Sequence, residues 1–346
     1  IRDLRMSRGL GDVYKRQGKK WTWLAKIFAF FGAGVGLFGI GTFTQVNSIA
    51  SAVKNFFDPD MAHTVSLFGG NYSWATVVAG VILTLCVGLV VLGGIQRIAK
   101  VSEVIVPFMA ILYFVVVIIL ILCNITALPA AIKTIVIAAF TPKAVTGGAV
   151  GSMLVAMQKG VARGIFSNEA GLGSAPIAAA AAQTNEPVRQ GLVSMTGTFI
   201  DTIIICTMTG LSIVLTGAWQ VEGIEGVQVT TYAFQNGLPL PQKLTAFILM
   251  LCLVFFAFTT ILGWDYYSER CLEYLTNGHQ KKIIVYRWLY ILAVFIGPYM
   301  TVSAVWTIAD IFNGLMAIPN MIALFALSGV VAKETKDFFK AEKHKL

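Results

Sequence analysis

Residues 160–182 read GVARGIFSNEAGLGSAPIAAAAA and lie in the middle of a long apolar region. The stretch nonetheless contains four glycines, an arginine, the triplet Ser167-Asn168-Glu169 and a proline. A membrane-spanning helix cannot run smoothly through such a passage, because its backbone groups would not all find partners inside the helix. We therefore expect a break over residues 166–171, preceded by an apolar half-helix over residues 150–158.

A second half-helix is expected to begin at Ser174, which can act as the N-cap, with Pro176 tolerated in the first turn. The run from Ala178 to Ala182 would continue it with the best helix-forming residue. Irregular backbone at membrane depth is tolerated where protein buries it or a watery cavity wets it. Helix ends facing a cavity offer N–H groups to a carboxylate and carbonyls to a cation, so the pattern favours a transporter. The alternative is a Gly-rich kink that only packs helices, but packing has no use for a buried Glu beside Ser and Asn.

The composition predicts an all-α polytopic membrane protein. Of 346 residues, 57% are hydrophobic and 12% are charged, and the mean hydropathy is +0.76. The net charge of +9 does not indicate nucleic-acid binding, because the basic residues cluster in short connections and at both ends. About eight spans are long and apolar enough to cross a bilayer. They cover residues 21–52, 73–95, 104–124, 147–182, 190–219, 243–274, 283–300 and 305–331.

The order of these spans predicts an inverted-repeat fold that is truncated. Many secondary transporters contain two inverted repeats, each opened by a broken helix. In this sequence the broken span is the first of about five spans, which would make one complete repeat, and only about three spans precede it. The first two core helices of the other repeat are therefore missing from the pattern. Residues 18–346 then form a partial transmembrane transporter domain. Residues 1–17 are basic, lack an apolar core and are interpreted as a non-native leader.

The charged connections predict an orientation with both termini in the cytoplasm. Placing the N-terminus inside leaves Lys133 and Lys143 as exceptions, and puts the acidic connection with Glu222 and Glu225 outside. The basic residues that then lie inside are Arg97, Lys100, Arg189, Arg270, Lys281, Lys282 and Arg287.

Several long segments resemble the sodium:alanine/glycine symporter family of prokaryotic amino-acid carriers. They are residues 160–182, PVRQGLVSMTGTFIDT at 187–202, TQVNSIA at 44–50, FAFTTILGWDYYSE at 256–269 and DIFNGLMAIPN at 310–320. The resemblance extends from Gly18 to about Phe339. It implies a leucine-transporter-like fold in a prokaryotic plasma (inner) membrane. It also implies symport of a small neutral amino acid, alanine or glycine, with Na⁺ as the co-transported ion and no other cofactor.

Within this resemblance, candidate substrate-binding residues surround the break. Ser167 and Asn168 would hold the ammonium and carboxylate groups of the substrate, and the exposed backbone near Gly171 would assist. The N-terminal end of the second half-helix, near Gly173 and Ser174, would attract the carboxylate. The side chains expected to wall or line the pocket are Phe166, Trp264 and Gln45; Trp264 could instead be an interfacial anchor, and Gln45 could serve packing.

Three residues are candidates for binding the ion. Thr259 and Thr260 are adjacent hydroxyls inside one span, and oxygen ligands suit a hard cation; the alternative is that each bonds back to the preceding helical turn. Asp201 lies near the middle of the span predicted over residues 190–219, where a carboxylate needs a cation or a proton. Its possible partners are Arg163, Lys159 or a bound ion.

Other functions remain open from the sequence. A membrane-embedded enzyme would need a nucleophile with a base or a metal cluster, and the predicted spans contain no histidine. The chain could be a non-functional, N-terminally truncated fragment. It could also belong to a proton-coupled carrier in which Asp201 or Glu169 titrates.

Overall fold

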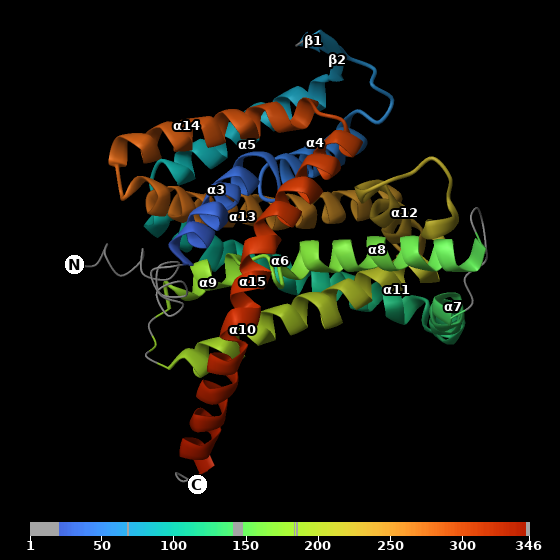
Figure 1. Cartoon of the computed structure of the whole chain (residues 1–346). Helices are drawn as coiled ribbons and strands as arrows, with labels where there is room; N and C mark the ends of the chain where they lie inside the picture. The colour runs from blue at the N-terminus through green and yellow to red at the C-terminus, as the bar shows by residue number, and fades with distance from the viewer. Residues whose placement is uncertain (1–20, 68, 141–147, 183, 185, 344–346) are drawn as a thin grey trace.

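The computed structural model describes residues 21–67, 69–140, 148–182, 184 and 186–343. The segment 1–17, predicted to be a leader, lies outside these residues. The described part is built almost wholly of helices, and seven of its helical segments are long and apolar enough to cross a membrane. Most helices run roughly along one direction, whereas the last one crosses the bundle obliquely and projects beyond it (Figure 1). The expectation of an all-α polytopic membrane protein is confirmed.

The first predicted span, 21–52, is two helices rather than one. Helix α3 covers Thr22–Phe38 and α4 covers Phe43–Phe57, so residues 39–42 interrupt the span. The Thr42 hydroxyl donates to the carbonyls of Gly36 and Leu37 at 2.8 and 3.0 Å, which satisfies carbonyls left free at the end of α3. Gly41 has a φ of +95°, and a Cβ there would lie 2.1 Å from the Cβ of Trp264. Only glycine fits both the conformation and the close approach.

A hairpin and two antiparallel helices follow. Strands β1 (Thr64–Leu67) and β2 (Gly70–Ser73) pair antiparallel, and Ser73 caps α5 (Trp74–Val91) by accepting from the backbone N–H of Ala75. Helix α6 runs over Ile95–Cys123, so it begins well before the predicted start of its span at residue 104. Pro107 lies inside this helix.

The segment between the predicted spans 104–124 and 147–182 is helical in its described part. It consists of a 3-10 turn, η2 (Ile125–Ala127), and α7 (Leu128–Phe140). The broken span then comprises α8 (Gly148–Asn168) and α9 (Ser174–Ala179). Helix α8, which carries Lys159 and Arg163, is not among the seven apolar segments.

The next predicted span, 190–219, is divided by a π-helix. It consists of α10 (Pro187–Phe199), the π-helix η3 (Ile200–Cys206) and α11 (Thr207–Leu215). The acidic connection after it contains a 3-10 turn, η4 (Ala218–Gln220), and a helix that the sequence analysis did not predict, α12 (Val227–Gly237).

The last elements are long. Helix α13 covers Gln242–Thr276 and α14 covers Gln280–Ile296, followed by the 3-10 turn η5 (Gly297–Tyr299). Helix α15 covers Val302–Lys343 with Pro319 inside it, so the charged tail continues the last span as an exposed helix.

Helix α13 connects the two main cores. One core joins α3, α4, α5, α13, α14 and α15 around residues such as Phe28 and Trp264, and the other joins α6, α11, α12 and α13 around Phe234. Tyr290 on α14 donates to the carbonyl of Gly41 at 3.1 Å and to that of Ile261 at 2.7 Å. The interruption between α3 and α4 is therefore held by α13 and α14.

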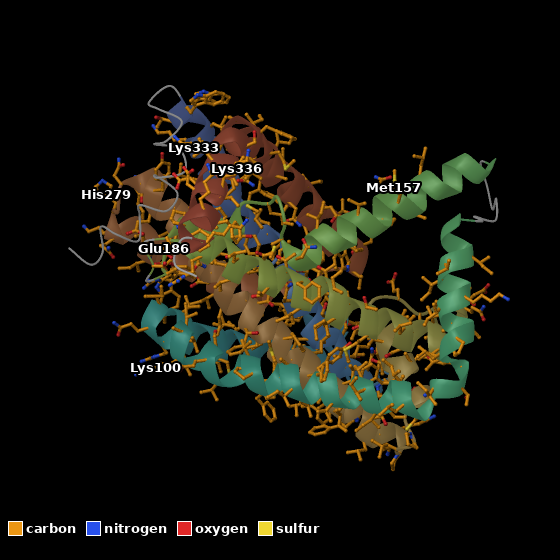
Figure 2. The ribbon with its side chains drawn as sticks, turned by 90° about the horizontal axis from the view of Figure 1, so that it is seen from below. Lys100, Met157, Glu186, His279, Lys333 and Lys336 are labelled. Carbon is orange, nitrogen blue, oxygen red and sulfur yellow. The ribbon has the colours of Figure 1, made fainter. Side chains whose placement is uncertain are left out.

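One end of the bundle gathers connections that are far apart in sequence. Figure 2 shows Lys100, Glu186, His279, Lys333 and Lys336 all at this end, whereas α7 and the beginning of α8 lie at the opposite end. The orientation predicted from the charges, with both termini in the cytoplasm, stays a prediction.

Candidate functional site

The broken helix predicted from the sequence is present. Helix α8 ends at Asn168, residues 169–173 are not helical, and α9 begins at Ser174. The turn uses positive φ angles of +56° at Glu169, +80° at Gly171 and +96° at Gly173. The predicted limits of the break need correction at both sides. On the first side, α8 does not end near Gln158 but continues to Asn168, so that Phe166, Ser167 and Asn168 form its last turn. The alanine run also leaves the helix early, since α9 ends at Ala179.

Side chains from three elements hold the break in place. The Glu169 carboxylate accepts hydrogen bonds from the Ser174 hydroxyl at 2.5 Å and from the Trp264 indole N–H at 2.9 Å. Asn168 accepts from the backbone N–H of Ala170 at 2.9 Å, and the Asn320 amide donates to the carbonyl of Gly171 at 2.9 Å. The open turn is thus fixed by α13 and α15 as well as by its own residues.

The N-terminal end of α9 is placed differently from the expectation. Gly173 precedes it, and a Cβ on Gly173 would lie 2.4 Å from the Phe28 ring, so this end is packed against α3. Ser174 is buried and its hydroxyl bonds Glu169 instead of capping the helix. This helix end is surrounded by other side chains of the protein, and Gly173 and Ser174 line neither of the two cavities described below.

Trp264 is buried, with 2% of its surface exposed. It is therefore not an interfacial anchor. Its indole bonds Glu169 and its Cβ packs on Gly41, so it connects the two interrupted helices α3–α4 and α8–α9. It does not line either cavity.

A large cavity of about 660 Å³ lies beside the break. Its lining residues come from α4, α6, the end of α8, η3, α11, α12, α13 and the start of α15. Its polar lining residues include Asn47, Ser167, Asp201, Thr209, Glu225 and Gln228.

Asp201 and Ser167 meet at the wall of this cavity. The Ser167 hydroxyl lies 2.9 and 2.8 Å from the two carboxylate oxygens of Asp201, and the Thr202 hydroxyl lies 3.3 Å from one of them. Asn168 donates to the Thr202 hydroxyl at 3.0 Å. In the described part of the chain, the donors to Asp201 are thus neutral hydroxyls, and Arg163 is not its partner. The π-helix η3 presents the carboxylate, and such helices often occur at functional sites.

A smaller cavity of about 190 Å³ adjoins the large one. It brings together three of the predicted residues, Gln45, Phe166 and Thr260, with Trp306. The Gln45 side-chain oxygen accepts from the backbone N–H of Gly41 at 2.7 Å and from the Thr44 hydroxyl. Gln45 therefore stabilises the start of α4 in addition to facing the cavity.

The two threonines of α13 contact different neighbours. Thr259 is buried, donates to the carbonyls of Phe255 and Phe256 at 3.0 Å, and lies against the sulfur of Met109. Thr260 donates to the carbonyl of Phe256 at 2.9 Å and lines the small cavity. Both hydroxyls bond back to the preceding turn, so their role in ion binding stays a prediction.

Sequence reasoning missed the contribution of α15. Trp306 packs on Phe166 with ring centroids 4.8 Å apart, and Arg163 pairs with Asp310 at 2.5 Å. The only signal was the position of Trp306 one helical turn before the segment DIFNGLMAIPN. Tyr113 of α6, which bonds Thr209 and lines the large cavity, was also missed because α6 looks uniformly apolar.

Comparison with known proteins identifies the family. The model of the sodium:alanine symporter family matches residues 4–346. The chain belongs to the sodium:alanine symporter family. It is 53% identical over 328 residues to an uncharacterized transporter of Haemophilus influenzae, covering 94% of this chain and 68% of that protein.

Two further relatives have names that include a transported amino acid. The sodium/alanine symporter AgcS of Methanococcus maripaludis is 44% identical over 324 residues, covering 93% of this chain and 66% of AgcS. The probable sodium/glutamine symporter GlnT of Bacillus subtilis is 36% identical over 344 residues, covering 99% of this chain and 67% of GlnT. The chain thus spans about two thirds of the length of these relatives. Membership of this family makes the chain part of a multi-pass amino-acid transporter rather than an enzyme, with Na⁺ as the coupling ion of the family.

Proposed function

We propose that the protein containing this chain carries out sodium-coupled symport of alanine or glycine, with the substrate bound beside the break at residues 166–171. The family and the 44% identity to AgcS support the type of transport. The cavities that adjoin the break support the location, because both are lined by residues from the end of α8 and from α4.

The arrangement around Asp201 carries the proposal of ion coupling. A carboxylate inside a membrane protein is costly unless a cation or a proton accompanies it. Asp201 is met here by the hydroxyls of Ser167 and Thr202 at the wall of a cavity. An additional Na⁺ would find hard oxygen ligands there, as it requires. We assign Asp201, Ser167 and Thr202 as ion ligands ahead of Thr259 and Thr260, whose hydroxyls donate within α13.

The substrate would lie between the ion and the small cavity. Ser167 and Asn168 end α8 at this point, and Gln45 and Phe166 line the small cavity. Gly171 acts indirectly, because its carbonyl is bonded to Asn320. Trp264 also acts indirectly, by fixing Glu169 in the break. A bound ion that neutralises Asp201 would strengthen binding of the substrate carboxylate, which couples the two solutes.

The same features suggest how the gradient drives uptake. Closing of the outer path with both solutes bound, followed by opening of the inner path, would release them together. The membrane potential contributes about 2.3 kcal/mol per charge per 100 mV to this movement. The end of the bundle that carries Lys100, Lys333 and Lys336 (Figure 2) would face the cytoplasm of a prokaryotic cell, with both termini inside.

Uptake of labelled alanine into proteoliposomes with an inward Na⁺ gradient tests the proposal. We expect uptake to fall to the background when K⁺ replaces Na⁺ at constant pH. Uptake that persists without Na⁺ but follows a proton gradient would favour the proton-coupled alternative. Comparing alanine binding to the isolated chain and to a longer protein that includes it tests whether the chain alone is a non-functional fragment.

A further inference from the structure

Trp306 lies where the two cavities meet. The large and the small cavity share the lining residues Thr44, Ser48, Leu253, Phe256 and Trp306. Trp306 has the largest side chain of this set. A change in its size or position would therefore alter how much of the large cavity is continuous with the small one.

The indole of Trp306 contacts two side chains of α8. Phe166, in the last turn of α8, packs against it with ring centroids 4.8 Å apart. The guanidinium carbon of Arg163 lies 4.3 Å from the Trp306 ring and 5.5 Å from the Phe166 ring. Cation–π contact of this kind favours one orientation of the ring.

Asp310 in turn fixes Arg163. Its carboxylate receives two hydrogen bonds from Arg163, of 2.6 and 2.5 Å, and it lies one helical turn after Trp306 on α15. The cluster of Arg163, Phe166, Trp306 and Asp310 thus joins α8 to α15 next to the substrate cavity. Since the Arg163 charge is already paired with Asp310, its main effect at the cavity is to position the indole.

The volumes of the two cavities indicate that a boundary between them is needed to exclude larger amino acids. Pockets of about 300–1,000 Å³ accommodate drug-sized ligands, and the large cavity of about 660 Å³ falls in that range. Alanine and glycine are far smaller, and the cavity of about 190 Å³ is closer to their needs. A boundary between the two spaces is required if larger amino acids are to be excluded.

We propose that Trp306 is the specificity-determining residue that limits the size of the substrate side chain, and that Arg163 and Asp310 are the residues that position it. This inference rests on the proposed function and deepens it. Removing the indole opens the small cavity toward the large one, so a longer side chain can extend into the added space. Glutamine is an informative probe, because GlnT of the same family is named as a probable sodium/glutamine symporter.

The test introduces W306A and W306F into the longer protein that contains this chain. Trp288, whose side chain is 57% exposed on α14, supplies the matched control W288A. Sodium-dependent uptake of labelled alanine is competed with unlabelled glycine, alanine, 2-aminobutyrate, valine and glutamine. In W306A we expect the inhibition constants of valine and glutamine, relative to that of alanine, to fall by about tenfold or more. W306F should give a smaller change, and W288A should keep the wild-type ranking.

Two positioning variants separate this role from a purely structural one. In R163Q and D310N the KM for alanine should rise with a smaller change in kcat, and the selectivity should move towards that of W306A. The charge-exchanged pair R163D/D310R should recover selectivity only in part, because it restores the ion pair but not the contact of a cation with the indole.

The outcomes distinguish this inference from the proposed function. An unchanged competitor ranking in both W306A and W306F, with alanine uptake retained, would overturn the inference and leave the proposed function standing. If W306A does not fold, as judged by size-exclusion chromatography, the competitor rankings of W306F and R163Q test the inference instead. Absence of sodium-dependent alanine uptake and binding in the wild-type protein that contains this chain would reject the proposed function, and the inference with it.

Discussion

The indole N–H of Trp264 on α13 donates a 2.9 Å hydrogen bond to the carboxylate of Glu169, and this bond fastens the break after α8 to α13. Glu169 lies in the break after α8 with a φ of +56°, which is unusual for a residue with a side chain. The Cβ of Trp264 packs on Gly41 in the interruption between α3 and α4. Because Trp264 contacts both Glu169 and Gly41, the break after α8 and the interruption between α3 and α4 both pack against α13.

Replacing Glu169 should reveal whether its shape or its charge matters. In E169A the Trp264 indole loses its acceptor while buried, which costs about 1–3 kcal/mol. In E169Q both bonds can persist, because the amide oxygen accepts from the indole and the Ser174 hydroxyl can turn to accept from the amide nitrogen. We expect a clear fall in thermal stability in detergent for E169A and almost none for E169Q. A large loss of stability or transport in E169Q would mean that the negative charge itself is needed, as in a proton-coupled carrier.

Gly41 should be intolerant of any side chain. In G41A the new Cβ would lie 2.1 Å from the Cβ of Trp264, and the φ of +95° would be strained as well. Overpacking costs about 1–3 kcal/mol, in addition to about 1–2 kcal/mol for left-handed backbone. G217A is the control, because Gly217 has left-handed backbone with a φ of +69° and nothing within 4 Å of an added Cβ. Thermal unfolding should show G41A to be much less stable than G217A, and equal stabilities would contradict the packing argument.

The main break could be predicted from sequence because glycines and polar residues interrupt an apolar run there. The interruption at residues 39–42 was not predicted, because its glycines fall within residues 27–53, which carry no charge and read as a continuous apolar helix. Its cause is tertiary: Trp264 and Tyr290, more than two hundred residues later in the sequence, pack on or bond to Gly41.

The contacts within the candidate site could not be predicted either, because they also depend on tertiary structure. Local sequence identified Ser167 and Asp201 separately, but their pairing depends on η3 presenting the carboxylate toward the end of α8. A π-helix has no reliable local sequence signal, since it depends on one shifted set of backbone bonds. Trp306 was overlooked because a tryptophan in an apolar span is ordinarily a packing or interfacial residue.

Neutralising Asp201 should weaken the coupling to sodium. In D201N the side chain can still bond the Ser167 hydroxyl, but it no longer attracts a cation. We expect the affinity for alanine at a fixed Na⁺ concentration to fall about tenfold or more, equivalent to about 1.4 kcal/mol. S167A should have a smaller effect in the same direction, and D60N, at an exposed loop position, should have none. Titration of Na⁺ during alanine binding provides the measurement, and an unchanged sodium dependence in D201N would remove Asp201 from the ion site.

Gln45 should have two separable roles, one in the fold and one in binding. Its side-chain oxygen is engaged by the backbone N–H of Gly41 and the hydroxyl of Thr44, so this oxygen supports the interruption before α4. Its amide nitrogen has no acceptor within the described residues, and Gln45 lines the small cavity, so the nitrogen is the group that would donate to a substrate carboxylate. In Q45E the accepting oxygen is kept and the donor is replaced by an oxygen that repels the carboxylate. In Q45A both are lost.

These two variants should lose stability for different reasons but lose binding alike. Q45A loses the bond to Gly41 and unfolds earlier, by about 0.5–1.5 kcal/mol for one hydrogen bond, whereas Q45E keeps that bond and is destabilised by its unaccompanied carboxylate. Both should bind alanine about tenfold or more weakly. Thermal unfolding without substrate and alanine binding at saturating Na⁺ measure the two effects separately. Wild-type affinity in Q45E would show that Gln45 acts only in the fold, because the one group that this substitution removes is the amide donor.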